Sequence, residues 1–331
     1  LMHPKISGFN IAIENNKEII KCDQIKGTPA YLAPETYKYK EYSCKSDVYS
    51  FGLIIYELMT GKKVFELKMS PKKIKEKLEN DQIHLNFDEN PINIAYRELI
   101  EKCIKINPNE RPTFDEILNE LKTNRGFINE TINEVEYQEY IKFITESKEI
   151  SFNPSNRISY FDIIIKNRLN DFYDVNERIN FRSIYDTEYN NVLFDYDFID
   201  LSDYEKIDCI EESINLKKYY VKEKKTGKMM VAFRFMQSFD EFYIMGKFVS
   251  TNLYHINRMI GLDHPAILKF VGYCPYDFKN RPYPMFIVEP PSNGSIDELF
   301  KSGENKKENT LFDDTKRLIN IYGIASAMAY M

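Results

Sequence analysis

The chain has 331 residues and a formal net charge of −6, from 45 basic and 51 acidic side chains. This acidic excess argues against non-specific binding to nucleic acid or to an acidic membrane surface. The five cysteines are scattered and odd in number, which favours reduced thiols over disulfides or a zinc site. No apolar run approaches the ~20 residues of a membrane span, and no signal peptide opens the chain. A cytoplasmic protein is therefore expected, with neither membrane nor nucleic acid as partner.

In the first third of the chain, apolar side chains repeat at the spacing of helices buried on one face. One helix is predicted within residues 46–62 and another within residues 99–121. The apolar positions are Phe51, Ile54, Ile55 and Leu58 in the first, and Leu99, Ile100, Cys103 and Ile104 in the second. Pro108 and Pro112 predict a turn inside the second stretch, because proline disfavours helix in the residue before it.

Three motifs surround these helices in order: GTPAYLAPE at 27–35, SDVYSFGLIIYELMTGK at 46–62 and LIEKCIKINPNERPTFDEILNEL at 99–121. Together they resemble the second half of a protein kinase, from the end of the activation segment onward. The RPTF spelling resembles the tyrosine-kinase-like group. The Gly-Thr-Pro opening, with Thr28 in the substrate loop, resembles the serine/threonine form. This resemblance covers residues 1–122 and implies a mainly helical C-lobe.

The kinase resemblance assigns structural roles to three charged residues. Glu35 and Arg111 match the ion pair between the APE glutamate and the arginine of the RP motif, so both are expected to be buried and paired. A lone buried charge is costly, and each therefore needs the other. Asp47 matches the helix aspartate that accepts hydrogen bonds from the catalytic-loop backbone. This chain contains no such loop, so Asp47 is expected to lack its usual partner.

The magnesium site is altered. In protein kinases the aspartate of Asp-Phe-Gly holds magnesium against the nucleotide phosphates. The matching triplet here is Gly8-Phe9-Asn10, and glycine has no ligand atom. Gly8 therefore replaces the magnesium aspartate, and no metal is expected at this position.

Residues 123–202 form a polar, tyrosine-rich connector. Helical periodicity within residues 127–144 predicts one helix, and the rest has too many aromatic and aliphatic residues for a purely disordered linker. The periodic positions are Ile128, Ile132, Val135, Tyr140 and Ile141. A helix followed by a partly ordered connector is expected.

A second resemblance covers residues 203–331, which are similar to the first half of a protein kinase. KKTGKMMVAFRFM at 224–236 resembles the hairpin leading into the Val-Ala-Ile-Lys strand, and GLDHPAILKFVGYC at 261–274 the segment after helix C. MFIVEPPSNGSIDELF at 285–300 resembles the hinge, and LFDDTKRLINIYGIASAMAYM at 311–331 the long helix before the catalytic loop. The resemblance implies a β-rich N-lobe, a hinge and a long helix.

The nucleotide pocket implied by this second resemblance is degenerate. Arg234 replaces the strand lysine with a planar fork in place of a point charge, and His255 aligns with the glutamate of helix C. Pro291 falls where a hinge amide donates to adenine, although proline has no N–H. The pocket positions are Ile210, Glu212 and Asn215 in place of the three loop glycines, then Arg234, His255, Glu289 and Pro291.

The predicted fold is therefore α+β and kinase-like, with a helical C-lobe followed by the N-lobe of a second unit. One hypothesis is an inactive pseudokinase or scaffold that binds signalling proteins or other kinase domains and needs no cofactor. The alternative is part of an active serine/threonine kinase, using ATP and magnesium, whose catalytic loop lies outside this chain. No His-Arg-Asp motif, and hence no catalytic residue, occurs in the sequence. The chain is expected to be a fragment of a tandem array; the alternative is a natural rearrangement that resembles a circularly permuted kinase fold. Its final helix is expected to dock on the helix that carries Ile54 and Leu58.

Overall fold

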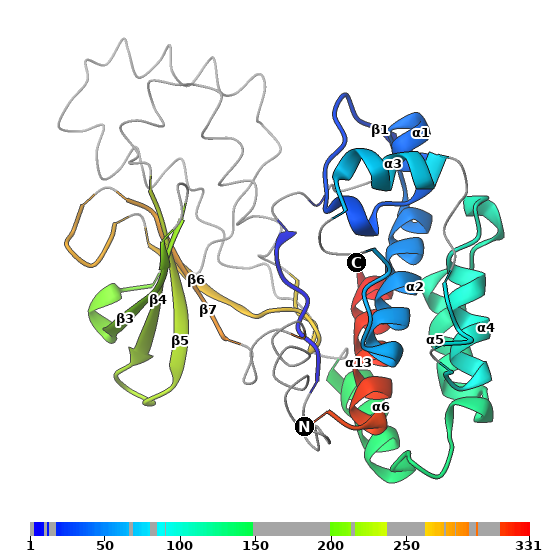
Figure 1. Ribbon diagram of the computed structural model, residues 1–331. Helices are drawn as coiled ribbons and strands as arrows, with labels where there is room; N and C mark the ends of the chain where they lie inside the picture. The colour runs from blue at the N-terminus through cyan, green and yellow to red at the C-terminus, as the bar shows by residue number, and fades with distance from the viewer. Residues whose placement is uncertain are drawn as a thin grey trace. The chain divides into compact units, whose positions relative to one another are not determined.

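The computed structural model divides into two compact units (Figure 1). Unit 1 comprises Leu1–Glu149, His264–Ile267 and Pro291–Met331, and unit 2 comprises Ile150–Asp263 and Leu268–Pro290. The structure describes residues 3–9, 12, 18–65, 69–79, 85–89, 91–147, 199–212, 216–236, 262–274, 276–281, 283–290, 296 and 312–331. No helix in these ranges is long and apolar enough to cross a membrane.

Unit 1 is mainly helical. Its helices are α1 (Pro34–Tyr39), α2 (Cys44–Thr60), α3 (Pro71–Glu79), α4 (Ile94–Cys103), α5 (Phe114–Thr123), α6 (Glu134–Ser147) and α13 (Asp314–Tyr330). Short 3-10 turns lie at η2 (Pro29–Tyr31), η3 (Pro108–Glu110) and η4 (Arg125–Phe127), and β1 (Ile20–Lys21) pairs with β2 (Glu41–Tyr42). The two long helices expected near residues 46–62 and 99–121 are thus α2 and the pair α4 and α5, which are separated at η3.

Local sequence fixes where these helices begin and end. The α5 helix opens with a capping box, in which Glu116 N–H donates to Thr113 Oγ1 at 3.2 Å and Thr113 N–H donates to Glu116 Oε2 at 2.7 Å. Asp313 caps α13 by accepting the N–H of Lys316 at 2.8 Å. The α2 helix ends at Gly61, whose positive φ of 68° suits the left-handed residue after a helix.

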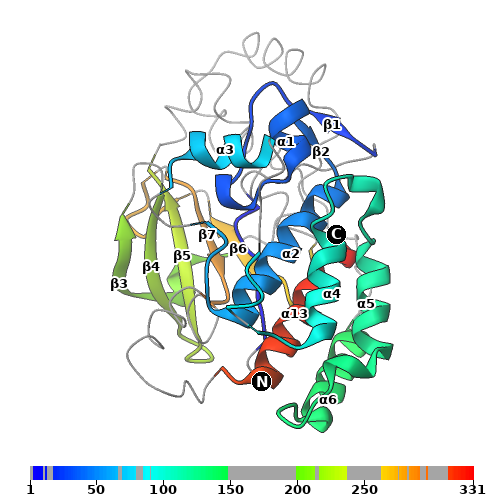
Figure 2. The same ribbon diagram turned by 45° about the vertical axis from the view of Figure 1, so that its right-hand side comes forward.

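The core of unit 1 gathers around α2 and includes the helix from the far end of the chain. Helix α13 packs against α5, α6 and α2 (Figure 1, Figure 2). Leu318 is fully buried in the same cluster as Leu58, and the partly buried Ile54 and Met328 pack against that cluster. The final helix therefore docks on the first part of the chain, as the sequence predicts.

Helix α6 clamps α13 through polar and aromatic contacts. The N–H of Asn133 donates to Thr315 Oγ1 at 2.8 Å, and Lys316 Nζ lies 2.9 Å from Glu136 Oε2. On the apolar side, the rings of Tyr137 and Tyr322 meet edge to face with centroids 5.9 Å apart. Burial of these rings and the ion pair together fix how α6 lies on α13.

The sequence-based prediction for this helix is wrong in two details. The helix begins at Glu134, not near residue 127, because Asn129 and Asn133 bond the backbone of Thr131 and Glu136 and so favour turns before it. Val135, expected on the buried stripe, is 69% exposed. Tyr140, also on the predicted stripe, is buried as expected, together with Tyr137 and Ile144. The remaining connector lies outside the described residues, apart from 199–202.

The beginning of the chain also packs within unit 1. The N–H of Ile6 donates to the carbonyl of Ala266 at 2.8 Å, next to a parallel bridge between Ile6 and Ile267. Gly323 on α13 is required at its position, because a Cβ there would lie 2.6 Å from Pro4 Cγ. Close approach of the first residues to α13 therefore depends on a helical glycine.

Unit 2 contains a five-stranded antiparallel sheet. Its strands are β3 (Tyr204–Glu212), β4 (Leu216–Glu223), β5 (Met229–Phe235), β6 (Phe270–Cys274) and β7 (Met285–Val288), in the order β3-β4-β5-β7-β6. Alternation along β5 buries Met230 and Ala232 in a cluster with Val221, Met285 and Ile287. The β-rich character expected for this part is present.

Candidate functional site

The segment that resembles the kinase substrate loop is anchored on α2. Ser50 Oγ donates to the carbonyl of Tyr31 at 2.7 Å, and the hydroxyl of Tyr31 donates to Glu57 Oε2 at 2.8 Å. Tyr37 OH donates to the carbonyl of Pro29 at 2.9 Å. Thr28 precedes η2, is exposed and caps it without a side-chain hydrogen bond. Side chains of α1 and α2 thus hold this loop by hydrogen bonds, while Thr28 is exposed to solvent.

Gly27 opens this loop in a conformation that other residues adopt with strain. Its φ is +122°, and a Cβ there would lie 2.6 Å from Leu32 Cδ2. We expect Gly27→Ala to lower the free energy of unfolding of unit 1 by about 1–3 kcal/mol, measured by urea denaturation. Gly61→Ala is the matched control, because Gly61 also has a positive φ of 68° but meets nothing within 4 Å. Equal losses in the two variants would contradict a role for the contact with Leu32.

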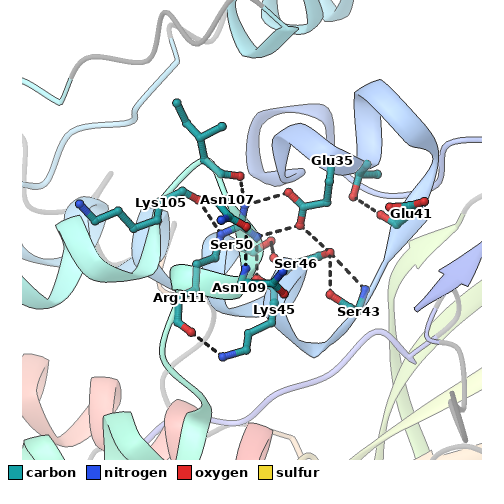
Figure 3. Close-up of polar contacts among 12 residues, drawn as sticks. Glu35, Glu41, Ser43, Lys45, Ser46, Ser50, Lys105, Asn107, Asn109 and Arg111 are labelled. Carbon is teal, nitrogen blue, oxygen red and sulfur yellow. Dashed lines mark hydrogen bonds and ion pairs between the residues drawn. The ribbon is translucent and has the colours of Figure 1, made fainter. Parts of the chain in front are cut away.

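A buried ion pair joins Glu35 of α1 to Arg111, the residue that follows η3. Arg111 Nη1 and Nη2 donate to Glu35 Oε1 and Oε2 at 2.7 and 2.8 Å, so the pair is bidentate (Figure 3). The side chain of Arg111 is 0% exposed and that of Glu35 is 7% exposed. Ser46 Oγ donates a further bond to Glu35 Oε1 at 2.9 Å. The structure therefore brings together the two residues that the sequence pairs.

Every N–H of the Arg111 guanidinium is used inside the protein. Besides Glu35, it donates to the carbonyls of Lys105 at 2.7 Å, Lys45 at 2.8 Å and Ile106 at 3.2 Å (Figure 3). Its Cζ lies 5.0 Å from the centroid of the Tyr49 ring. Five donors with five acceptors leave none for a ligand, so this cluster joins α1, α2 and the turn before α5.

Asp47 lies in the first turn of α2. Its side chain is exposed and forms no hydrogen bond with any residue that the structure describes. Protein atoms fill much of the surrounding volume, and this desolvation raises the carboxyl pKa from 3.8 to about 6. The residue is placed where the sequence predicts, at the start of the central helix.

Gly8 has a positive φ of 81° and is exposed. Phe9 beside it is buried, and its carbonyl accepts the N–H of Ala12 at 3.1 Å. Asn10, the third residue of the triplet, lies outside the described residues. A left-handed backbone favours glycine at position 8, and glycine supplies no side chain to hold a cation.

The residues that match the glycine-rich loop end strand β3. Ile210 and Glu212 are both exposed, and Glu212 forms a cross-strand ion pair with Lys217 on β4. A second such pair joins Glu211 to Lys218 at 2.5 Å. Lysines of the next strand therefore neutralise the carboxylates at this end of the hairpin. Asn215, His255 and Pro291 lie outside the described residues.

Arg234 on β5, at the position of the strand lysine, lies in a cluster that sequence reasoning missed. Its Nε lies 3.2 Å from Asp277 Oδ2, and its Cζ lies 4.0 Å from the centroid of the Tyr283 ring. Arg281 binds the same carboxylate oxygen through Nη2 at 2.6 Å. Asp277 and Arg281 lie in a loop, where their four-residue spacing does not signal pairing, and only the tertiary fold brings Arg234 to them.

Glu289 aligns next to the hinge. Its backbone N–H and its side-chain carboxylate both have partners in unit 2. Its N–H donates to the carbonyl of Lys269 at 3.0 Å, and its Oε1 lies 2.7 Å from Lys228 Nζ. Its backbone donor is thus used within the sheet of unit 2.

Residues 2–121 match the family model for the protein kinase domain. This part of the chain is thus similar to part of a protein kinase domain; helices α1 to α4 lie within the matched residues, and α5 extends two residues beyond them. Helices α6 and α13, which complete the core of unit 1, lie outside them.

Curated kinases are similar to part of the chain. Dual specificity protein kinase shkC of Dictyostelium discoideum is 34% identical over 155 residues, which cover 44% of this chain and 29% of that protein. Serine/threonine-protein kinase PLK1 of Xenopus laevis is 34% identical over 130 residues, covering 38% and 21%. Serine/threonine-protein kinase VIK of Arabidopsis thaliana is 31% identical over 124 residues, covering 36% and 28%. The chain spans less than a third of the length of these relatives.

Proposed function

We propose that this chain is part of a catalytically inactive, pseudokinase-like protein that binds other proteins in cytoplasmic signalling. The family match over residues 2–121 and the kinase relatives support its kinase-like character. Its partners are signalling proteins or other kinase domains, and it requires no cofactor. The RPTF motif supports the tyrosine-kinase-like group, and Thr28 in Gly-Thr-Pro supports a serine/threonine-type substrate loop.

We also propose a tandem arrangement. Residues 1–122 are the C-lobe of a first kinase-like domain, residues 123–202 the connector, and residues 203–331 the N-lobe, hinge and long helix of a second. The five-stranded antiparallel sheet of unit 2 supports the N-lobe. Packing of α13 in unit 1 supports completion of the first C-lobe by the helix of the second domain.

The observation that carries the proposal is a contrast between residues that hold the fold together and the residue at the position of the magnesium ligand. The buried pair of Glu35 and Arg111 has all its hydrogen bonds, which supports a C-lobe that is kept as a scaffold. Gly8, in contrast, offers no ligand where the kinase resemblance requires a magnesium aspartate. A surface that keeps its shape without its metal ligand suits binding better than phosphate transfer.

The alternative is part of an active, ATP-dependent serine/threonine kinase whose catalytic loop lies outside this chain, with ATP and magnesium as cofactors. The names of the relatives, which are serine/threonine or dual specificity kinases, favour it. Asp47 would then hold the backbone of that loop.

Thermal unfolding with millimolar Mg-ATP tests the proposal. We expect the melting temperature to stay unchanged, because the resemblance places altered residues at the loop, strand, hinge and metal positions. Nucleotide at a hundred times its dissociation constant would add about 2.7 kcal/mol of stability, which the assay detects. Magnesium alone is the control. A clear upward shift, or phosphate transfer to a serine/threonine peptide, would contradict the proposal.

A further inference from the structure

The carboxylate of Asp277 is held rigidly by its own loop, between β6 and β7. Its Oδ1 accepts the N–H groups of Lys279 at 2.9 Å and Arg281 at 3.0 Å. Its Oδ2 accepts Arg281 Nε at 3.0 Å and Nη2 at 2.6 Å. These four bonds fix the carboxylate in a place where it is 5% exposed.

Asp277 remains ionised in this place. Burial alone would raise its pKa, but hydrogen bonds from the Arg281 side chain and from the backbone of Arg281 and Lys279 more than offset this, and its pKa lies below the ordinary value. The loop therefore presents a permanent negative charge at neutral pH.

Arg234 is the buried cation that faces this charge. It is 8% exposed, although a guanidinium keeps its charge at any ordinary pH. Its Nε, 3.2 Å from Asp277 Oδ2, makes a charge contact without hydrogen-bond alignment, and Nη1 donates weakly to Met236 Sδ at 3.6 Å. The ring of Tyr283 covers its face. A buried charge needs a counter-charge, and Asp277 supplies it.

We propose that Asp277 is a built-in counter-ion that occupies Arg234 in place of an anionic ligand such as a polyphosphate. The inference rests on the proposed function, because Arg234 stands at the position of the strand lysine that meets nucleotide phosphates in kinases. Asp277 also takes the role of the helix-C glutamate, whose aligned position is His255, since it orients the strand cation from the loop between β6 and β7. The contact makes unit 2 independent of nucleotide.

A double-mutant cycle tests the pairing. Asp277→Asn, Arg234→Met and the double variant are compared by amide hydrogen exchange of β5 and β7, in the whole chain. We expect Asp277→Asn to reduce protection at least tenfold more when Arg234 is present than in the Arg234→Met background, which is a coupling of about 1.4 kcal/mol. Asp208→Asn, an exposed acid on β3, is the matched control and should change protection little.

Should Asp277→Asn unfold unit 2, the double variant keeps the test decisive. Restored protection on adding Arg234→Met supports the proposal, because the stranded cation is then gone. A double variant no better protected than Asp277→Asn overturns it, as does additivity of the two substitutions.

Tripolyphosphate then probes the freed cation by thermal unfolding. The unsubstituted protein should show no shift, and Asp277→Asn should show an upward shift that disappears in the double variant. No shift in Asp277→Asn, or an Arg234-dependent shift in the unsubstituted protein, overturns the inference. Stabilisation by Mg-ATP that survives Arg234→Met would contradict the proposed function alone, whereas absent coupling would contradict this inference alone.

Discussion

Arg111→Ala should lower the free energy of unfolding of unit 1 by about 3–5 kcal/mol, the cost of leaving one partner of a buried pair uncompensated. Glu35, with a side chain only 7% exposed, would lose both guanidinium bonds. The carbonyls of Lys45, Lys105 and Ile106 would lose their donors as well. Urea denaturation followed by circular dichroism at 222 nm measures this loss, because all the described α-helices belong to unit 1.

Two further variants separate burial from charge. Arg97→Ala removes a surface pair with Glu101, whose N–O distance of 2.9 Å is nearly as short but whose side chains are 44% and 49% exposed. Exposed pairs of this i,i+4 type contribute about 0.3–0.5 kcal/mol, so little change is expected. Arg111→Lys keeps the charge but cannot supply five donors in a planar fork, and should recover only part of the loss. An Arg111→Ala effect as small as that of Arg97→Ala would show that the pair does not hold the loop.

Sequence alone predicts much of unit 1, because its signals are local and ordered. The helical stripe around Phe51 predicts α2, and the two prolines predict the break between α4 and α5. The pairing of Glu35 and Arg111, which are 76 positions apart, was available only because their motifs resemble those of a known family.

The errors and omissions have physical causes. Val135 fits a helical stripe, but α6 meets α13 through Tyr137 and Tyr140, and periodicity carries no information about that partner. Asp277 was missed because its loop is irregular and its contact with Arg234 depends on how β5 lies beside β7. Such contacts between segments far apart in the sequence have no pattern in either segment.

Leu318→Ala should cost about 2–5 kcal/mol in the unfolding of unit 1, the range for removing a buried leucine side chain from a packed core. Leu318 is 0% exposed and lies in the same cluster as Leu58 of α2 and Leu121 of α5. A loss of this size, measured by the same urea denaturation, is expected only when α13 unfolds together with the first part of the chain. The substitution therefore tests whether a helix that follows the connector and the sheet belongs to the core of unit 1.

Val135→Ala is the matched control, because it also shortens an aliphatic side chain in unit 1 but at a position that is 69% exposed. Its effect should stay within about 0.5 kcal/mol. If Leu318→Ala has no larger effect, α13 does not share the cooperative core. Residues 2–121 match the kinase family model. A large effect would mean that the hydrophobic core formed by their helices is completed by α13, which lies outside the matched residues. Although Glu136 and Lys316 link α6 to α13, Lys316→Ala should add little to the loss, because the ion pair is partly exposed and burial of the apolar face holds the helix.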